Sequence, residues 1–130
     1  MRGPHVRITR LPDEVMGCYD AASNVVWLDD RLSRQEHRCT LEHELVHAER
    51  GDTALPDPVA NAKQEQLVHR EASRRLIPID QLGDALKWTI EARELAECLE
   101  VDLPTLQARL DALDAAERAH LEQIAARRDP

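Results

Sequence analysis

Residues 33–51, SRQEHRCTLEHELVHAERG, decide the fold, because they contain a helix with clear ends and a polar motif inside it. Ser33 followed by Glu36 fits a capping box, in which two side chains satisfy the unpaired amides of a helix start. Gly51 stands where a helix commonly ends on a left-handed residue. The stretch therefore predicts one helix that starts after Ser33 and runs to about Arg50.

The motif inside this helix is HELVH at residues 43–47. Residues four apart share a helix face, so His43 and His47 can reach one metal ion while Glu44 projects beside them. Zinc bound there would lower the pKa of a water molecule, and Glu44 would accept its proton during attack on a carbonyl. The competing interpretation is a solvated helix face that happens to hold two histidines. Cys39 shares the face and is expected to be a small buried hydrophobe.

A second helix is expected to begin near Val59 and to stop before Pro78, since proline cannot continue the backbone hydrogen bonding. A catalytic zinc site needs a third protein ligand and one open position. At about 100° per residue, Glu65 falls on the apolar, inward face of this helix and is the expected third ligand. Glu71 points roughly 120° away and is expected to be an ordinary solvated charge.

His69 follows Glu65 by one turn on the same predicted face. A polar group there costs free energy unless it is paired or binds a metal. We expect His69 to orient a metal ligand or to donate a hydrogen bond to the transition state. Two alternatives stay open, a direct ligand role and a satisfied histidine with no further role.

Short β-like segments precede the first helix, at residues 5–9, 15–19 and 25–28, and indicate a small antiparallel sheet. After Pro78 the pattern predicts short helices at residues 79–88, 90–99 and 103–127. The expected fold is therefore α+β, with the sheet packed on the motif helix and on the second helix. We expect residues 1–78 to form a metallopeptidase core and residues 79–130 to pack on it as a helical extension of one compact domain.

The composition limits the possible partners and the cellular location. The 130 residues include 25 acidic and 17 basic side chains, a net charge of −8. An acidic chain lacks the electrostatic footprint for nonspecific binding to nucleic acid or to an anionic membrane face. Three cysteines far apart in the sequence favour a reducing cytosol over a disulfide framework. With no signal-peptide pattern and no apolar run long enough to span a bilayer, a soluble cytoplasmic protein is expected.

The motif and the segment EQLVHREASRRLIP at residues 65–78 resemble the ImmA/IrrE-type metallopeptidases. That family has a small sheet, an HExxH helix and a second helix of the form ExxA(N/D)xFAxxLLxP. The resemblance covers about residues 15–78 and implies that His43, His47 and Glu65 are zinc ligands and that Glu44 is the general base. His69 stands where the family usually has Asn or Asp, and Glu71 where it has Phe.

Residues 94–110, ELAECLEVDLPTLQARL, resemble a helix-turn-helix with Ala96 packed inside and Val101 in the turn. A DNA reader needs Arg and Lys toward the phosphates. Residues 81–130 instead carry 11 acidic and 6 basic side chains, a net charge of 6 − 11 = −5. The segment is therefore expected to pack on the core or to contact a protein partner. The simpler alternative is an amphipathic helical pair that completes the core.

These observations predict a zinc-dependent peptidase that cleaves a protein substrate. The family resemblance implies the substrate class, because short members are encoded by phages and mobile elements and act as antirepressors that cleave a helix-turn-helix repressor. A basic repressor would also be attracted by the acidic chain. An extended substrate segment could add to the small sheet beside the metal. The alternatives are a non-catalytic module that binds a repressor or regulator around a structural metal, and a DNA-binding regulator built on the C-terminal helices.

Overall fold

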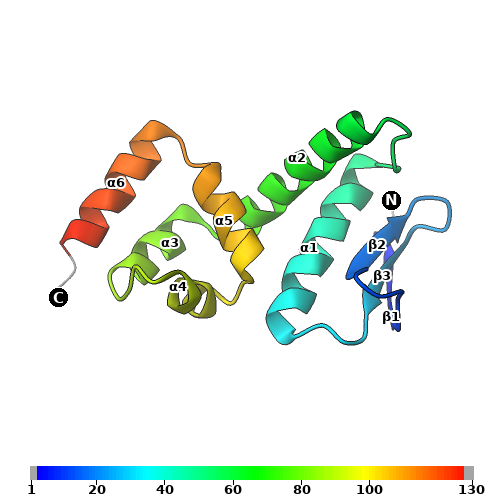
Figure 1. Ribbon diagram of the computed structural model, residues 1–130, viewed down its shortest axis with the longest axis horizontal. Coiled ribbons are helices and arrows are strands. Elements are labelled where there is room, and N and C mark those ends of the chain that lie inside the picture. The colour runs from blue at the N-terminus through cyan, green and yellow to red at the C-terminus, as the bar shows by residue number, and fades with distance from the viewer. Residues whose placement is uncertain (1–2, 128–130) are drawn as a thin grey trace.

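The computed structural model describes residues 3–127 as a small sheet and six helices (Figure 1). The sheet, α1 and α2 lie at one end of the molecule, and α3, α4 and α6 lie at the other (Figure 1). The predicted α+β fold is thus confirmed, but the sheet packs against α1, whereas α2 packs on α1 and α5. Among the described residues, no helix is long and apolar enough to cross a membrane. In chain order the elements are β1 (His5–Thr9), β2 (Gly17–Asp20), β3 (Val25–Asp29), α1 (Arg34–Arg50), α2 (Pro58–Leu76), α3 (Ile79–Leu86), α4 (Ala92–Leu99), α5 (Leu103–Asp111) and α6 (Ala115–Ala126).

The sheet is mixed, with the strand order β1-β3-β2. β3 pairs antiparallel with β2 but parallel with β1, so the prediction of an antiparallel sheet is wrong for β1. β3 takes the central place because its side chains are the most apolar and best buried, with Val26 and Leu28 fully buried. The loop of residues 10–16 carries the chain past β3 to the other edge, and β2 begins only at Gly17.

Arg31 holds this loop with a network of hydrogen bonds. Its Nε donates to the buried carboxylate of Asp29 at 2.8 Å. Its Nη1 donates to the exposed carboxylate of Asp13 at 2.9 Å, and its Nη2 donates to the Leu11 carbonyl at 2.8 Å. The Leu11 amide donates to Asp29 at 2.9 Å. The hydrogen bond from Arg31 is the main reason why the pKa of Asp29 lies well below its usual range. The loop is therefore fixed to the end of β3.

Helix α1 has the predicted ends. The Ser33 side chain accepts from the Glu36 amide at 3.1 Å, and the Glu36 carboxylate accepts from the Ser33 amide at 2.9 Å. Gly51 ends the helix with φ +70°, in the left-handed region where glycine is preferred. Asp57 caps α2, and Pro58 stands in its first turn, where a missing amide hydrogen costs nothing. Val46 of α1 packs in a small buried cluster between these two helices.

The C-terminal helices differ from the prediction at one point. Residues 103–127 form two helices, because α5 ends at Asp111 and α6 starts after Asp114. Asp114 and Glu117 form a second capping box, the same signal that starts α1. The helices share the larger apolar core of the chain with the end of α2. This core includes Leu76, Ile77, Leu82, Ala85, Leu86, Leu95, Ala96, Leu99, Val101, Leu106 and Leu121.

Two arginines join the helix-turn-helix-like pair, α4 and α5, to the preceding part of the chain. Arg38 of α1 donates from Nη1 to the carbonyls of Leu99 at 3.1 Å and Glu100 at 2.7 Å, at the end of α4. Arg109 of α5 is buried and donates from Nε to the Ile77 carbonyl at 2.7 Å, at the end of α2. α5 itself packs along α2 (Figure 1). These contacts join α4 and α5 to α1 and α2.

Candidate metal centre

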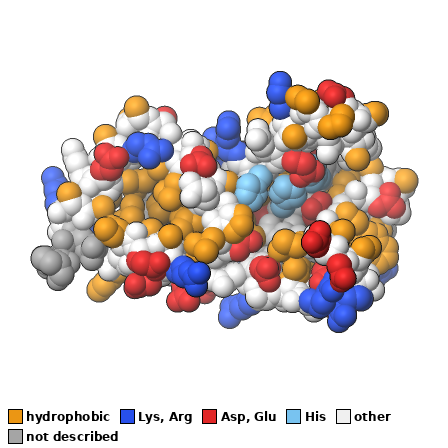
Figure 2. Space-filling model, in the orientation of Figure 1, with side chains coloured by type: hydrophobic (Ala, Val, Ile, Leu, Met, Phe, Trp, Pro, Cys, Tyr) orange, Lys and Arg blue, Asp and Glu red, His pale blue; other side chains and the backbone are white. Residues whose placement is uncertain are grey.

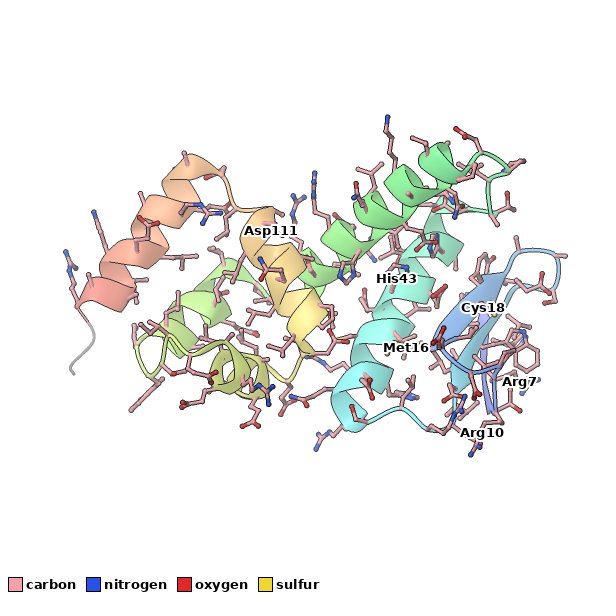
Figure 3. The ribbon with its side chains drawn as sticks, in the orientation of Figure 1. Arg7, Arg10, Met16, Cys18, His43 and Asp111 are labelled. Carbon is pink, nitrogen blue, oxygen red and sulfur yellow. The ribbon has the colours of Figure 1, made fainter. Side chains whose placement is uncertain are left out.

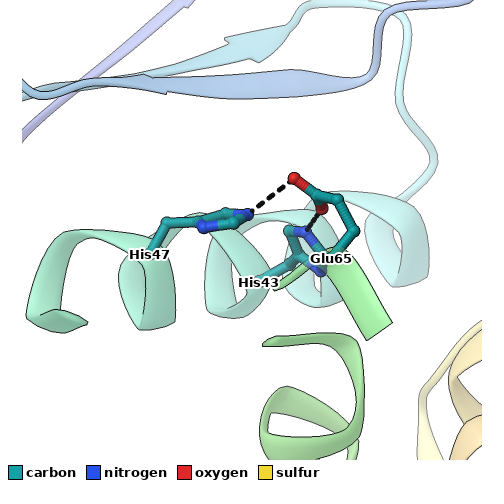
Figure 4. Close-up of side chains that lie close together, drawn as sticks. All are labelled: His43, His47 and Glu65. Atoms are coloured by element: carbon teal, nitrogen blue, oxygen red, sulfur yellow. Dashed lines mark hydrogen bonds and ion pairs between the residues drawn. The ribbon is translucent and has the colours of Figure 1, made fainter. Parts of the chain in front are cut away.

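Three side chains from two helices meet in front of α1. His43 and His47 lie one turn apart on α1, and Glu65 reaches them from α2 (Figure 4). Nε2 of His43 lies 2.8 Å from Oε2 of Glu65, and Nε2 of His47 lies 3.1 Å from Oε1 of Glu65. Each residue offers one ligand atom within 4.8 Å of the other two. The structure thus brings together the three residues that the sequence analysis singled out as metal ligands.

Asp52 fixes the orientation of His47, and the sequence analysis missed it. Oδ2 of Asp52 lies 3.1 Å from Nδ1 of His47 and accepts from Nε of Arg50 at 2.7 Å. This leaves Nε2 of His47 free to face Glu65. A signal for Asp52 was present in the helix end, because a left-handed residue at Gly51 turns the next residue back toward the last turn of α1. The backbone amide of Asp52 indeed donates to the His47 carbonyl at 3.0 Å.

The protonation states suit metal binding. Burial lowers the pKa of His43 against the opposing effect of Glu65, so the ring is neutral at physiological pH. Burial raises the pKa of Glu65, but hydrogen bonds and charge from both histidines outweigh it and leave that pKa below its usual value. The Glu65 side chain is 47% exposed, so it stands at the edge of a cleft and not on a buried face as predicted.

Glu44 is the buried acid of the site. It is only 7% exposed, and no donor among residues 3–127 hydrogen-bonds its carboxylate. Burial raises its pKa to about 7, with Glu65 adding to the rise and His47 opposing it. A buried carboxylate without a partner costs free energy unless water or a ligand satisfies it. This residue therefore has the exposure and pKa of a group that exchanges a proton near neutral pH.

A cleft of about 600 Å³ opens over these four residues. Its sheet-side wall is formed by residues 14–19, and Cys39 and Thr40 lie along α1. The opposite wall includes His69 of α2 and the start of α5, and residues 52–54 close the His47 end. Figure 2 shows the histidines in this hollow with acidic side chains around them. The cleft therefore leaves the histidines and the carboxylates accessible to a ligand.

The chain is similar to one known protein family. The model of a peptidase family, Peptidase M78, described as the IrrE N-terminal-like domain, matches residues 2–111. The chain belongs to this family. The match extends through α5, well beyond residues 15–78 on which the sequence resemblance depends. No curated protein and no solved structure gives a significant match.

The donor set of this family member fits a divalent metal ion. Two imidazole nitrogens and a carboxylate oxygen are the ligands that zinc accepts in catalytic sites. His47 has its second nitrogen held by a carboxylate, which is the usual support for a metal-binding histidine. The unpartnered carboxylate of Glu44 lies in the same cleft. His43, His47 and Glu65 could therefore hold a metal ion.

His69 lies beside this group and is not one of its three members. Its ring centroid is 5.8 Å from that of His43, and its Nε2 lies 3.2 Å from the Pro104 carbonyl oxygen. A carbonyl only accepts, so Nε2 carries the hydrogen in this contact. Glu71, in contrast, points outward and pairs with Arg75, as expected for a solvated charge.

Proposed function

We propose that the chain is a zinc-dependent metallopeptidase that cleaves a protein substrate. The observation that carries this proposal is the group of His43, His47 and Glu65 at the cleft, with the buried carboxylate of Glu44 beside it. The three residues would hold the metal through two imidazole nitrogens and one carboxylate. Bound zinc supplies the Lewis acid that polarises the scissile carbonyl. Membership of a peptidase family supports the same reaction class.

Glu44 acts as the general base. Its carboxylate accepts a proton from the attacking water and returns it to the leaving amine, which balances the hydrolysis of the peptide bond. In the metal-free protein burial raises the pKa of Glu44 to about 7. The positive charge of a bound metal ion would lower this pKa and keep the carboxylate ionised, as a general base requires.

His69 acts as a positioning residue in this proposal. While its Nε2–H donates to Pro104, a neutral ring leaves Nδ1 as an acceptor. Donation to a developing oxyanion through Nδ1 would require the doubly protonated ring. The contact instead fixes the start of α5 next to His43. At the position where the family usually has Asn or Asp, His69 would thus hold the start of α5 in place as a wall of the cleft.

The substrate binds as an extended strand. β2 pairs with β3 on one side only, and residues 16–19 line the cleft. A substrate segment that adds to the free edge of β2 would make main-chain hydrogen bonds and present its carbonyls to the metal. Such pairing requires an extended backbone with free main-chain groups, so a flexible or unfolded segment of the substrate is preferred.

A DNA-binding repressor is the substrate class we favour, which makes the protein a cytoplasmic antirepressor of a phage or mobile element. Two observations support it. The family resemblance implies repressor cleavage, and the net charge of −8 attracts a protein with a basic DNA-binding face. Cleavage that weakens at high salt is the signature expected of this attraction.

The test combines zinc analysis and cleavage of a candidate repressor encoded next to the gene. The zinc-loaded protein should produce fragments, whereas Glu44→Gln should bind zinc and produce none. Glu97→Gln, a change at an exposed acid on α4, is the matched control and should cleave normally. Fragments from zinc-loaded Glu44→Gln would refute the general-base role. Zinc and repressor binding without cleavage by the unchanged protein would identify a non-catalytic binding module.

A further inference from the structure

The cleft is lined by carboxylates and by no Lys or Arg. Three of its acids already have roles or partners, namely Glu44, Glu65 and Asp52. The other two, Glu14 and Asp102, form no ion pair with any cation in the described part of the chain. In the space-filling view no Lys or Arg lies inside the histidine hollow, although one basic side chain lies close above it (Figure 2). Two carboxylates of the cleft are therefore available to a ligand.

Glu14 approaches from the sheet side. It directly precedes Val15, Met16 and Gly17, and the backbone of Gly17 packs so closely on α1 that a Cβ there would lie 2.6 Å from Cγ2 of Thr40. Residues 14–16 line the cleft and directly precede this contact of Gly17 with Thr40. Met16 lies beside α1 and below His43 in Figure 3. The Arg31 network described above fixes the loop that carries these residues.

Asp102 borders the Thr40 end of the cleft from the side of α5. Its backbone amide lies 3.5 Å from Sγ of Cys39, the residue next to Thr40. Its Oδ1 accepts from the Thr105 amide at 2.9 Å and caps α5, which leaves Oδ2 facing no cation. Burial is the main reason why the pKa of Cys39 is raised, so its thiol is neutral. This end of the cleft thus combines an uncharged thiol with a partly free carboxylate.

Exposed apolar side chains lie next to the acidic ones in this part of the cleft. Val15 and Met16 are each 38% exposed, so their side chains offer apolar surface to a ligand. Lys and Arg side chains bury an apolar stem and keep a charged head beside polar groups. An anionic side chain would meet only like charges at Glu14 and Asp102. The surface therefore matches a long cationic side chain in both shape and charge.

We propose that the Thr40 end of the cleft is a subsite for a Lys or Arg side chain of the substrate, recognised by Glu14 and Asp102. Val15, Met16 and Cys39 contact the stem of that side chain. The carboxylates bind its charged head. Because the occupant is a peptide side chain, the proposal rests on the function proposed above, and it adds that the scissile bond lies close to a basic residue.

The test measures peptide binding, so that it does not depend on turnover. Two fluorescent hexapeptide pools share random flanking residues and differ at one fixed position, which is arginine in one pool and its neutral isostere citrulline in the other. Binding to zinc-loaded Glu44→Gln protein is followed by anisotropy at low and high salt. The arginine pool should bind about tenfold more tightly than the citrulline pool, because a charge-assisted hydrogen bond is lost in the latter.

Substitutions then assign the preference to residues. Asp102→Asn removes the charge and keeps the helix cap, since Asn caps as well as Asp. Asp102→Asn and Glu14→Gln should each reduce the preference for arginine, and the double variant should abolish it. Asp114→Asn makes the same change at the cap of α6, and Glu97→Gln removes an exposed acid of α4. Both controls should keep the full preference.

Several outcomes would overturn the subsite. These are equal affinity for the two pools, no binding of either pool, or an equal loss of preference in the controls, which would indicate only long-range attraction to an acidic protein. The proposed peptidase function fails separately, when the unchanged zinc-loaded protein does not cleave. An arginine preference that depends on Glu14 and Asp102 would stand even then.

Discussion

Replacement of Glu44 by Gln should stabilise the metal-free protein, and the gain should grow with pH. Glu44 is 7% exposed and its pKa is raised to about 7 from 4.5. In the unfolded chain the carboxyl ionises near pH 4.5, but in the folded chain it keeps its proton until about pH 7. Stability therefore falls as pH rises from about 4.5 to about 7 and is constant above that range. Gln cannot ionise and does not lose this stability.

The magnitude follows from the difference between the two pKa values. Each pH unit of difference corresponds to about 1.4 kcal/mol, so the ionised carboxylate costs the folded state about 3 kcal/mol at pH 8. At pH 5 the cost to the folded state is only about 0.8 kcal/mol, because the carboxyl is ionised in only part of the unfolded chains. The free energy of unfolding of Glu44→Gln relative to the unchanged protein should thus rise by about 2.5 kcal/mol between pH 5 and pH 8. For a chain of this size the gain corresponds to roughly 9 °C in Tm.

Urea unfolding of both proteins at pH 5 and pH 8, in the presence of a chelator, measures this difference. Other titrating groups are common to both proteins and largely cancel. Glu97→Gln on the exposed surface should show no such pH dependence. A difference between Glu44→Gln and the unchanged protein that stays constant with pH would refute the idea that burial of an unpartnered carboxylate sets the pKa of Glu44.

Three further perturbations test the surroundings of the site. Asp52→Asn should weaken zinc binding about 10- to 100-fold in chelator competition, because the imidazole it orients loses its anionic partner; unchanged affinity would contradict this. Gly17→Ala should destabilise the fold by about 1–3 kcal/mol in urea unfolding, because the new methyl would lie 2.6 Å from Cγ2 of Thr40, and an added Thr40→Ala should recover part of the loss. Asp29→Asn should flatten the acid limb of the stability curve, because a carboxyl with a lowered pKa stabilises the fold above its unfolded pKa and loses that effect as pH falls; an unaltered acid limb would count against the Arg31 pairing.

Local signals in the sequence predicted the elements that place the candidate metal ligands. The capping box at Ser33 and Glu36 and the glycine at position 51 give α1 the bounds seen in the structure. The spacing of His43 and His47 places both imidazoles on one face. The helical face of Glu65 was sufficient to bring its carboxylate to them, although its exposure was not foreseen. Each of these features depends on interactions within a few turns of one helix.

Features that depend on contacts between distant segments were not predictable in this way. The order of the strands depends on which strand is most buried, and alternation within β1 does not show that it pairs in parallel with β3. Asp52 supports His47 only because the chain reverses at Gly51. The break after Asp111 was missed because the apolar pattern continues across it, although Asp114 and Glu117 carry the signal of a new helix start.

The contact between His69 and Pro104 has a consequence for how such proteins diversify. Because the start of α5 forms one wall of the cleft, the site is not contained in the sheet, α1 and α2 alone. Exchange of the C-terminal helices between relatives would therefore replace one wall of the cleft. Under the proposed peptidase function, a changed α5 would alter substrate preference while His43, His47 and Glu65 stay unchanged.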